Sequence, residues 1–269
     1  MKKVKTVILA GQSNAVGVGW CKYLPKSYDA AEIARFKDGY ENVLINYHSH
    51  DFRSDGFVPT RVNCTQKDWD TLGPEVGIAQ RWTELYPDEP LYIVKCAVGG
   101  TNMYFDWLSP SEWANLPATP ENANVGWLYK HFVTLMDESI AILAEQGCEP
   151  DVIGFFWMQG ESDAFLEEQH LNYERRYKAM LDDIRAAYGK YMEHCRFVDA
   201  GISDSVLWKF YAEVNEVKRA MAEKTPSFVY IDTIAAGLTT LNEPEDAPDI
   251  AHYDCESTVK LGRLFVDAL

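Results

Sequence analysis

The chain has 269 residues, of which 47% are hydrophobic and 13% aromatic, a composition that supports a packed core and excludes a disordered protein. Its 25 basic and 41 acidic residues give a formal net charge of −16, which repels nucleic-acid phosphates and anionic lipid surfaces. We therefore expect no nucleic-acid partner and no membrane partner. A single α/β domain of this length is ordinary, so we expect residues 1–269 to form one domain.

Six short apolar segments rich in β-branched residues have the length of buried strands. They lie at residues 4–10, 43–46, 91–97, 152–158, 197–200 and 228–231. Amphipathic segments with helical spacing separate several of them, around residues 128–143, 173–188 and 207–221. Strands that are apolar on both faces and alternate with such helices predict an α/β fold. The expected architecture is a three-layer α/β/α sandwich of flavodoxin-like type with a parallel sheet.

The cysteines and the N-terminal segment indicate the cellular compartment that we expect for the protein. The six cysteines form no C-x-x-C pair and have no histidine at metal-ligand spacing, so reduced thiols are favoured over disulfides or a metal site. The apolar run near the N-terminus is interrupted by Lys5 and is too short for a signal peptide. No segment approaches the length of a transmembrane helix. We expect a cytoplasmic protein without a metal or an organic cofactor.

Two connections are unusually long, at residues 48–73 and 103–126. Each follows a predicted strand, and long ordered loops at the carboxyl edge of an open α/β sheet commonly line a ligand site. The loops contain Trp69, Trp107 and Trp113, which either stack on sugar rings or pack the loops against the domain. The sequence leaves both interpretations open.

The segment Gly11-Gln12-Ser13-Asn14 follows the first predicted strand directly. A serine in a strand-to-helix turn is exposed at a helix N-terminus, where free N–H groups can stabilise an oxyanion. The alternative is that Ser13 only caps the helix, a common role for serine.

Three further sequence blocks decide between these interpretations. They are Ala-Val-Gly-Gly-Thr at 97–101, Trp-Met-Gln-Gly-Glu-Ser-Asp at 157–163 and Asp-Ile-Ala-His at 249–252. These three blocks follow the Gly-Gln-Ser-Asn block in the chain. With the four blocks in this order, the chain resembles the SGNH hydrolase superfamily. The resemblance is to its sialate O-acetylesterase and acetylxylan esterase branch, carbohydrate esterase family six. It spans the chain and implies a serine esterase that removes acetyl groups from a carbohydrate.

Acyl transfer requires a nucleophile, a base and a group that orients the base. Ser13 is the expected nucleophile, His252 the base, and Asp249 the acid that fixes the imidazole tautomer. Glu161 is a second candidate for the orienting acid, although it could instead serve donors at the start of a helix. The other histidines, at positions 48, 50, 131, 170 and 194, are expected to be structural or solvated.

The developing oxyanion requires donors as well. The expected donors are the backbone N–H of Ser13, that of Gly99 or Gly100, and the side-chain amide of Gln159, which could alternatively brace the loops. All follow the carboxyl ends of predicted strands, so the fold places them at one edge. Residues expected to support the site without contacting substrate are Gln12, Asn14 and Glu161.

The expected substrate is a small-molecule or oligosaccharide acetyl ester. A general short-chain esterase or thioesterase, and a non-catalytic carbohydrate-binding protein, are the alternatives. Gly73-Pro74-Glu75 also resembles a stretch of the same esterase branch, but proline followed by glutamate is a good helix start, and we assign it no chemistry. The sequence does not predict the oligomeric state or the sugar.

Overall fold

The computed structural model describes residues 1–49, 52–62 and 70–269. Within them, six long strands pair in parallel in the order β10-β9-β8-β1-β7-β3. They are β1 (Lys2–Gly11), β3 (Tyr40–Ser49), β7 (Leu91–Ala97), β8 (Cys148–Met158), β9 (Arg196–Ala200) and β10 (Phe228–Ile231). Each contains one predicted segment, so the predicted parallel sheet is confirmed for these strands.

Short strands add antiparallel pairing at one side. β4 (Phe52–Arg53) and β5 (Val58–Thr60) pair with β3, and β2 (Gly19–Trp20) pairs with β6 (Thr71–Leu72) in a separate two-stranded sheet. Three of these strands lie in the segment that we expected to be a loop. Strands of two or three residues are too short to give an alternating pattern in the sequence. The sheet is therefore largely, and not wholly, parallel.

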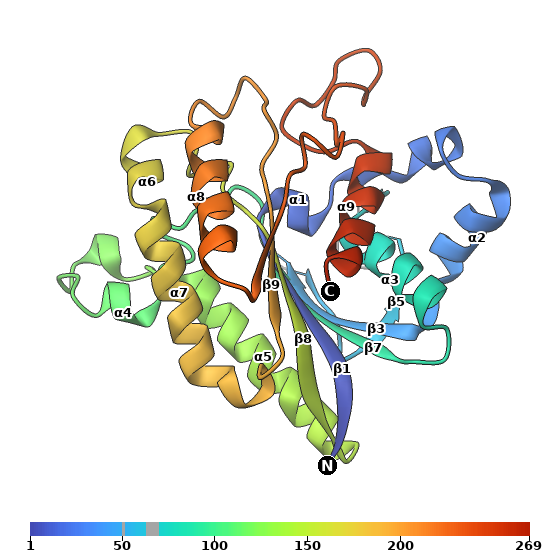
Figure 1. The fold of residues 1–269 in the computed structure, drawn as a ribbon, viewed down its shortest axis with the longest axis horizontal. Helices are drawn as coiled ribbons and strands as arrows, with labels where there is room; N and C mark the ends of the chain where they lie inside the picture. Colours follow the sequence, from blue (N-terminus) through green and yellow to red (C-terminus); the bar gives the residue numbers. More distant parts are fainter. Residues whose placement is uncertain (50–51, 63–69) are drawn as a thin grey trace.

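Helices cover both faces of the sheet (Figure 1). One layer contains α4 (Pro110–Trp113), α5 (Trp127–Glu145), α6 (Glu167–Leu171), α7 (Tyr173–Tyr188) and α8 (Tyr211–Lys224). The other contains α1 (Ser13–Val16), α2 (Ala30–Asp38), α3 (Pro74–Leu85) and α9 (Cys255–Asp267). Short 3₁₀ helices are η1 (Cys21–Lys26), η2 (Pro120–Asn122) and η3 (Gly189–Tyr191). The three-layer sandwich is confirmed. Among the residues described, no helix combines the length and hydropathy needed to cross a membrane.

Helices α3 and α9 pack with their backbones in direct contact. A Cβ atom at Gly77 would lie 1.9 Å from the carbonyl oxygen of Val259, and one at Gly262 would lie 1.9 Å from that of Pro74. Only glycine permits this approach. The first turn of α3 is therefore fixed relative to α9, the helix that follows the Asp249–His252 segment.

The turns after β1, β7 and β8 meet at the carboxyl edge of the sheet. The backbone N–H of Gln12 donates to the carbonyl of Met158 at 3.0 Å, and that of Val98 donates to the carbonyl of Gly11 at 3.3 Å. Gly11 has φ +146°, and a Cβ there would lie 1.9 Å from the oxygen of Met158. The close approach requires glycine and brings three predicted sequence blocks together.

Candidate active site

Ser13 is the first residue of α1, directly after β1, as predicted from the sequence. The helix has four residues, and the backbone N–H groups of Ala15 and Val16 both donate to the carbonyl of Gln12 at 2.8 Å. The N-cap is Gln12, with no side-chain capping bond. Capping therefore does not account for a serine at position 13.

Asp249 and His252 form a close pair in the loop before α9. Nδ1 of His252 lies 2.6 Å from Oδ2 of Asp249, and Oδ1 of the same carboxylate accepts from the backbone N–H of Ala251 at 3.1 Å. The His252 side chain is 27% exposed and that of Asp249 is 44% exposed. A carboxylate at Nδ1 holds the proton there, which leaves the lone pair of Nε2 for a base.

The side chain of Asn14 connects the serine turn to the histidine loop. Its Oδ1 accepts from the backbone N–H of Tyr253 at 2.9 Å, and its Nδ2 donates to the carbonyl of Ala251 at 3.4 Å. Ala251 and Tyr253 flank His252, and Asn14 follows Ser13. The amide therefore keeps the segments that contain the serine and the histidine adjacent.

Glu161 contacts the asparagine, whereas Asp249 contacts the imidazole. Oε1 of Glu161 accepts from Nδ2 of Asn14 at 2.7 Å, and the glutamate is completely buried. Burial raises the pKa of Glu161, and the hydrogen bond from Asn14 opposes the shift only in part. Of the two candidate acids, Asp249 has the geometry of an orienting group.

Gln12 holds the turn after β8 against the serine turn. Its Oε1 accepts from the backbone N–H of Gly160 at 3.3 Å and from that of Ser162 at 3.2 Å. The side chain is buried, and it points to the neighbouring turn and not to solvent. The contact joins the turn after β1 to the turn after β8.

Gln159 is completely buried and contacts three turns. Its Nε2 donates to Oδ2 of Asp163 at 2.5 Å and to the carbonyl of Thr101 at 3.2 Å, and lies 3.4 Å from Oε1 of Gln12. An amide has two N–H groups, so these three acceptors already occupy both. The burial and the acceptors favour bracing over donation to an oxyanion.

The turn after β7 presents its backbone at the surface. Gly99 is half-buried and Gly100 is exposed. Gly100 has φ +73°, and a Cβ there would meet no atom of residues 1–49, 52–62 or 70–269 within 4 Å. Oγ1 of Thr101 donates to the carbonyl of Val98 at 2.7 Å and closes the turn. The backbone of Gly100 is therefore exposed at this edge of the sheet.

Of the three loop tryptophans, Trp107 is completely buried, with its ring centroid 5.0 Å from that of Trp157, so it packs in the core and presents no face to a sugar. Trp113 is half-buried, and Nζ of Lys130 lies 4.8 Å from its ring centroid. Trp69 lies outside the described residues.

Most of the remaining histidines make ring contacts. His48 stacks on His131 with centroids 4.6 Å apart, and His170 stacks on Phe210 with centroids 4.0 Å apart. The side chain of His194 is 74% exposed. These contacts agree with the structural or solvated roles expected from the sequence, and His50 lies outside the described residues.

Two buried lysines at the same edge were not predicted. Nζ of Lys95 donates to the carbonyl of Val16 at 2.7 Å, and Nζ of Lys218 donates to that of Gln159 at 2.6 Å. Lys95 is the one charged residue in the apolar run 91–97, which was an available signal in the sequence. Lys218 lies in an amphipathic helix, where a lysine is unremarkable.

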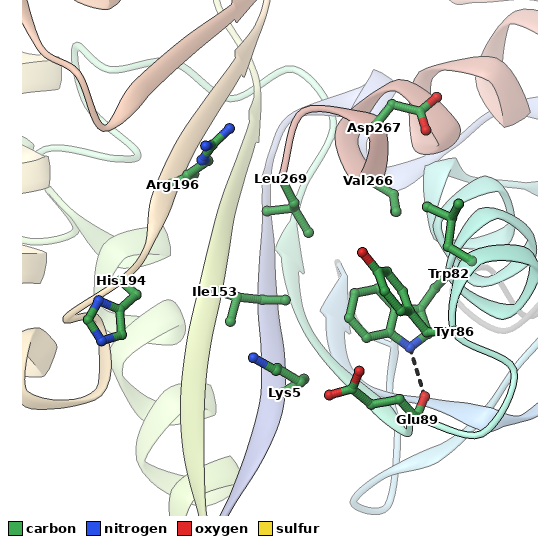
Figure 2. A pocket seen from close by; sticks show the side chains of 11 residues that line it. Lys5, Trp82, Tyr86, Glu89, Ile153, His194, Arg196, Val266, Asp267 and Leu269 are labelled. Atoms are coloured by element: carbon green, nitrogen blue, oxygen red, sulfur yellow. Dashed lines mark hydrogen bonds between the residues drawn. The ribbon is translucent and has the colours of Figure 1, made fainter.

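The opposite, amino edge of the sheet has a cavity of about 440 Å³ (Figure 2). Lys5 of β1, Ile153 of β8, the start of β9 and the ends of α3 and α9 line it, and none of the predicted site residues does. Across residues 1–49, 52–62 and 70–269, no group of three or more His, Cys, Asp or Glu side chains is placed to hold a metal ion.

A largely parallel sheet lies between two helical layers, and the sequence blocks that contain Ser13 and Gln159 lie at its carboxyl edge. This arrangement is the SGNH hydrolase fold. The chain belongs to the family described as carbohydrate esterase, sialic acid-specific acetylesterase, which it matches over residues 3–269. The resemblance inferred from the four blocks is confirmed, and the protein is a carboxylic ester hydrolase of the carbohydrate esterase class.

Solved structures share this fold at low sequence identity. A protein from Arabidopsis thaliana has a TM-score of 0.69 and 19% identity, with 98% of this chain and 96% of that chain covered. NanS has a TM-score of 0.66 and 15% identity, with 99% and 96% covered. A carbohydrate acetylesterase from Xanthomonas citri has a TM-score of 0.60 and 15% identity, with 98% of this chain and 55% of that chain covered. No curated protein matches significantly.

Proposed function

We propose that this esterase removes O-acetyl groups from a carbohydrate with Ser13 as nucleophile, His252 as base and Asp249 as the orienting acid. The observation that carries the proposal is the Asn14 side chain, which joins the serine turn to both residues flanking His252. The 2.6 Å contact between Asp249 and Nδ1 of His252 supports the assignment of the acid.

In this mechanism, Oγ of Ser13 attacks the acetyl carbonyl while Nε2 of His252 accepts its proton. The tetrahedral intermediate collapses when His252 returns that proton to the departing sugar oxygen, which leaves an acetyl group on Ser13. A water molecule, deprotonated by His252, then attacks the acetyl carbonyl. The bond to Oγ of Ser13 breaks, His252 returns the proton to Oγ, and acetate leaves. Asp249 stabilises the imidazolium formed in each half of the reaction.

The proposed oxyanion donors are the backbone N–H of Ser13 and that of Gly99 or Gly100. Ser13 begins a helix, where N–H groups lack helical partners. Gly100 lies in an exposed turn beside the end of β1. We assign Gln159 to bracing these turns, because it is buried and its amide has three acceptors within the protein.

The substrate we propose first is an O-acetylated sialic acid, because the family description specifies this sugar. Acetylated xylo-oligosaccharides are the comparison substrate. Acetyl transfer from either sugar uses the same atoms of the protein, so the two differ only in the fit of the sugar.

The test compares wild type, Ser13→Ala and Ser27→Ala on p-nitrophenyl acetate and on both sugars, with folding checked by circular dichroism. Ser27 is a surface control whose hydroxyl donates to Glu256 at 2.7 Å. We expect turnover by wild type and Ser27→Ala, and none by folded Ser13→Ala. Equal activity of wild type and Ser13→Ala would refute the nucleophile. A wild type inactive on all three esters would refute the proposed activity.

A further inference from the structure

Helix α1 ends on a buried ion pair. Nζ of Lys95 lies 2.6 Å from Oε2 of Glu75 and 2.7 Å from the carbonyl oxygen of Val16, the last residue of α1. The side chains of Lys95 and Glu75 are 0% and 1% exposed. A helix of four residues is too short to be stable alone, so tertiary contacts such as this one determine its orientation.

The Gly-Pro-Glu segment, which had no assigned role, builds this contact. A Cβ at Gly73 would lie 2.6 Å from the oxygen of Val16, and one at Gly17 would lie 2.0 Å from the Cα of Gly73. The start of α3 therefore lies directly against the end of α1. Pro74 occupies the first turn of α3, and Glu75 reaches Lys95.

The turn after β8 is held in the same way. Nζ of Lys218 lies 2.8 Å from Oδ1 of Asp199, and it donates to the carbonyls of Gln159 at 2.6 Å and Ala200 at 2.7 Å. Both charged side chains are at most 2% exposed. Each of the two turns that meet at Asn14 is thus anchored through a backbone carbonyl by a buried lysine with a carboxylate partner.

We propose that the Lys95–Glu75 pair is a positioning device for the nucleophile, which fixes α1 so that Ser13 faces His252. The inference rests on the proposed role of Ser13. A charge-assisted hydrogen bond in a low-dielectric interior is strong and directional, so it restricts how α1 can tilt. Neither side chain reaches the surface, so the pair acts through α1 and not on substrate.

Stability and positioning can be separated experimentally. Replacing a buried ion pair by apolar residues of similar volume is often neutral or stabilising, whereas removing one partner is strongly destabilising. We therefore choose the double variant Lys95→Met/Glu75→Leu, which removes the charges together and also the donor to Val16. The single variant Lys95→Met is expected to lose much more thermal stability than the double variant.

The measurements are kcat, KM and the rate at which an organophosphate, diisopropyl fluorophosphate, labels Ser13. In the folded double variant, kcat and the labelling rate should fall by about 10- to 100-fold, because a displacement of about 1 Å has an effect of that order. KM should stay within about threefold, because the substrate contacts remain. Every molecule should still be labelled at the end point.

Two controls make the comparison specific. Lys5→Met/Asp151→Leu removes a pair with a 3.6 Å contact between β1 and β8, at the amino edge where Figure 2 shows Lys5, and should keep wild-type rates. Glu75→Gln removes the carboxylate charge and should lower the thermal stability, but it retains an oxygen that can accept from Lys95. Below its melting temperature Lys95 therefore stays anchored, and the rates should stay within about threefold of wild type.

The outcomes distinguish the two proposals. A folded double variant that is labelled and turns over at wild-type rates overturns the positioning role. An unfolded double variant also counts against it, because the pair would then serve folding. If organophosphate labels neither wild type nor the variants although all are folded, the proposed role of Ser13 fails instead.

Discussion

Asn14 and Tyr253, 239 positions apart in the chain, are joined by a 2.9 Å hydrogen bond from the backbone N–H of Tyr253 to Oδ1 of Asn14. Nδ2 of the same amide donates to Glu161 at 2.7 Å. One side chain thus connects the serine turn, the turn after β8 and the loop before α9. Ser13 precedes Asn14 and His252 precedes Tyr253 in the chain, so each is one residue from this hydrogen bond.

Replacement of Asn14 by Ala should therefore affect both activity and stability. We expect kcat/KM on p-nitrophenyl acetate to fall by about 100-fold, because the serine and histidine segments lose their direct link. The free energy of unfolding should fall by about 2–4 kcal/mol, because Glu161 and the Tyr253 N–H lose a buried partner. Kinetics well below the melting temperature and urea denaturation measure the two effects.

The control for that variant is Asn122→Ala, which removes an exposed amide that donates to the carbonyl of Pro117 at 2.9 Å. It should change neither quantity appreciably. A folded Asn14→Ala enzyme with wild-type kcat/KM would show that the Asn14 contacts do not position the site.

Neutral variants of the two candidate acids, Asp249 and Glu161, should differ strongly in activity. Asp249→Asn should lower kcat by about 10²- to 10⁴-fold, because an amide at Nδ1 stabilises the wrong tautomer and cannot balance the imidazolium. Glu161→Gln should keep activity within about fivefold, because the new side chain still offers Asn14 an oxygen. Steady-state kinetics of both variants test the assignment, and the reverse pattern would make Glu161 the orienting acid.

The sequence predicted the sheet because buried parallel strands are apolar on both faces, as in Val7, Ile8 and Leu9, which are completely buried. Given that sheet, the position of Ser13 at its carboxyl edge followed. The contacts of Asn14 and Lys95 did not follow, because a pair of polar groups far apart in sequence produces no periodicity. Whether the loop residue Trp107 packs inside or faces outward likewise depended on a partner, Trp157, in the distant strand β8.

Gln159→Ala distinguishes a brace from an oxyanion donor. Because the amide is buried against Asp163, Thr101 and Gln12, we expect a loss of about 1–3 kcal/mol in the free energy of unfolding and less than a tenfold fall in kcat. A direct donor would instead cost about 10²- to 10³-fold in kcat with stability largely retained. Melting temperature and kcat, measured on the same preparation, decide between them.

Asp163 should make the stability of the fold depend on pH. Burial raises the pKa of Asp163 from its ordinary value of 3.8 to about 7, against the hydrogen bonds from Gln159 and Met103. The folded protein thus retains a proton that the unfolded chain releases. The retained proton raises the free energy of unfolding by at most about 4 kcal/mol. This stabilisation is fully present below about pH 4 and is lost as the pH rises through about 7.

Asp163→Asn should remove this share of the pH dependence, because its side chain is neutral throughout. The new amide can donate to Oε1 of Gln159, a buried oxygen for which the described part of the chain supplies no partner. Urea denaturation at pH 4.5, 6 and 7.5 should give a flatter profile than wild type, although not a level one, because burial also raises the pKa of Asp199 to about 6.

The control is Asp182→Asn, at a side chain that is 77% exposed, and it should keep the wild-type slope of stability against pH. Equal slopes for wild type and Asp163→Asn would mean that Asp163 is ionised in the folded protein across this range, with Gln159 and Met103 outweighing its burial.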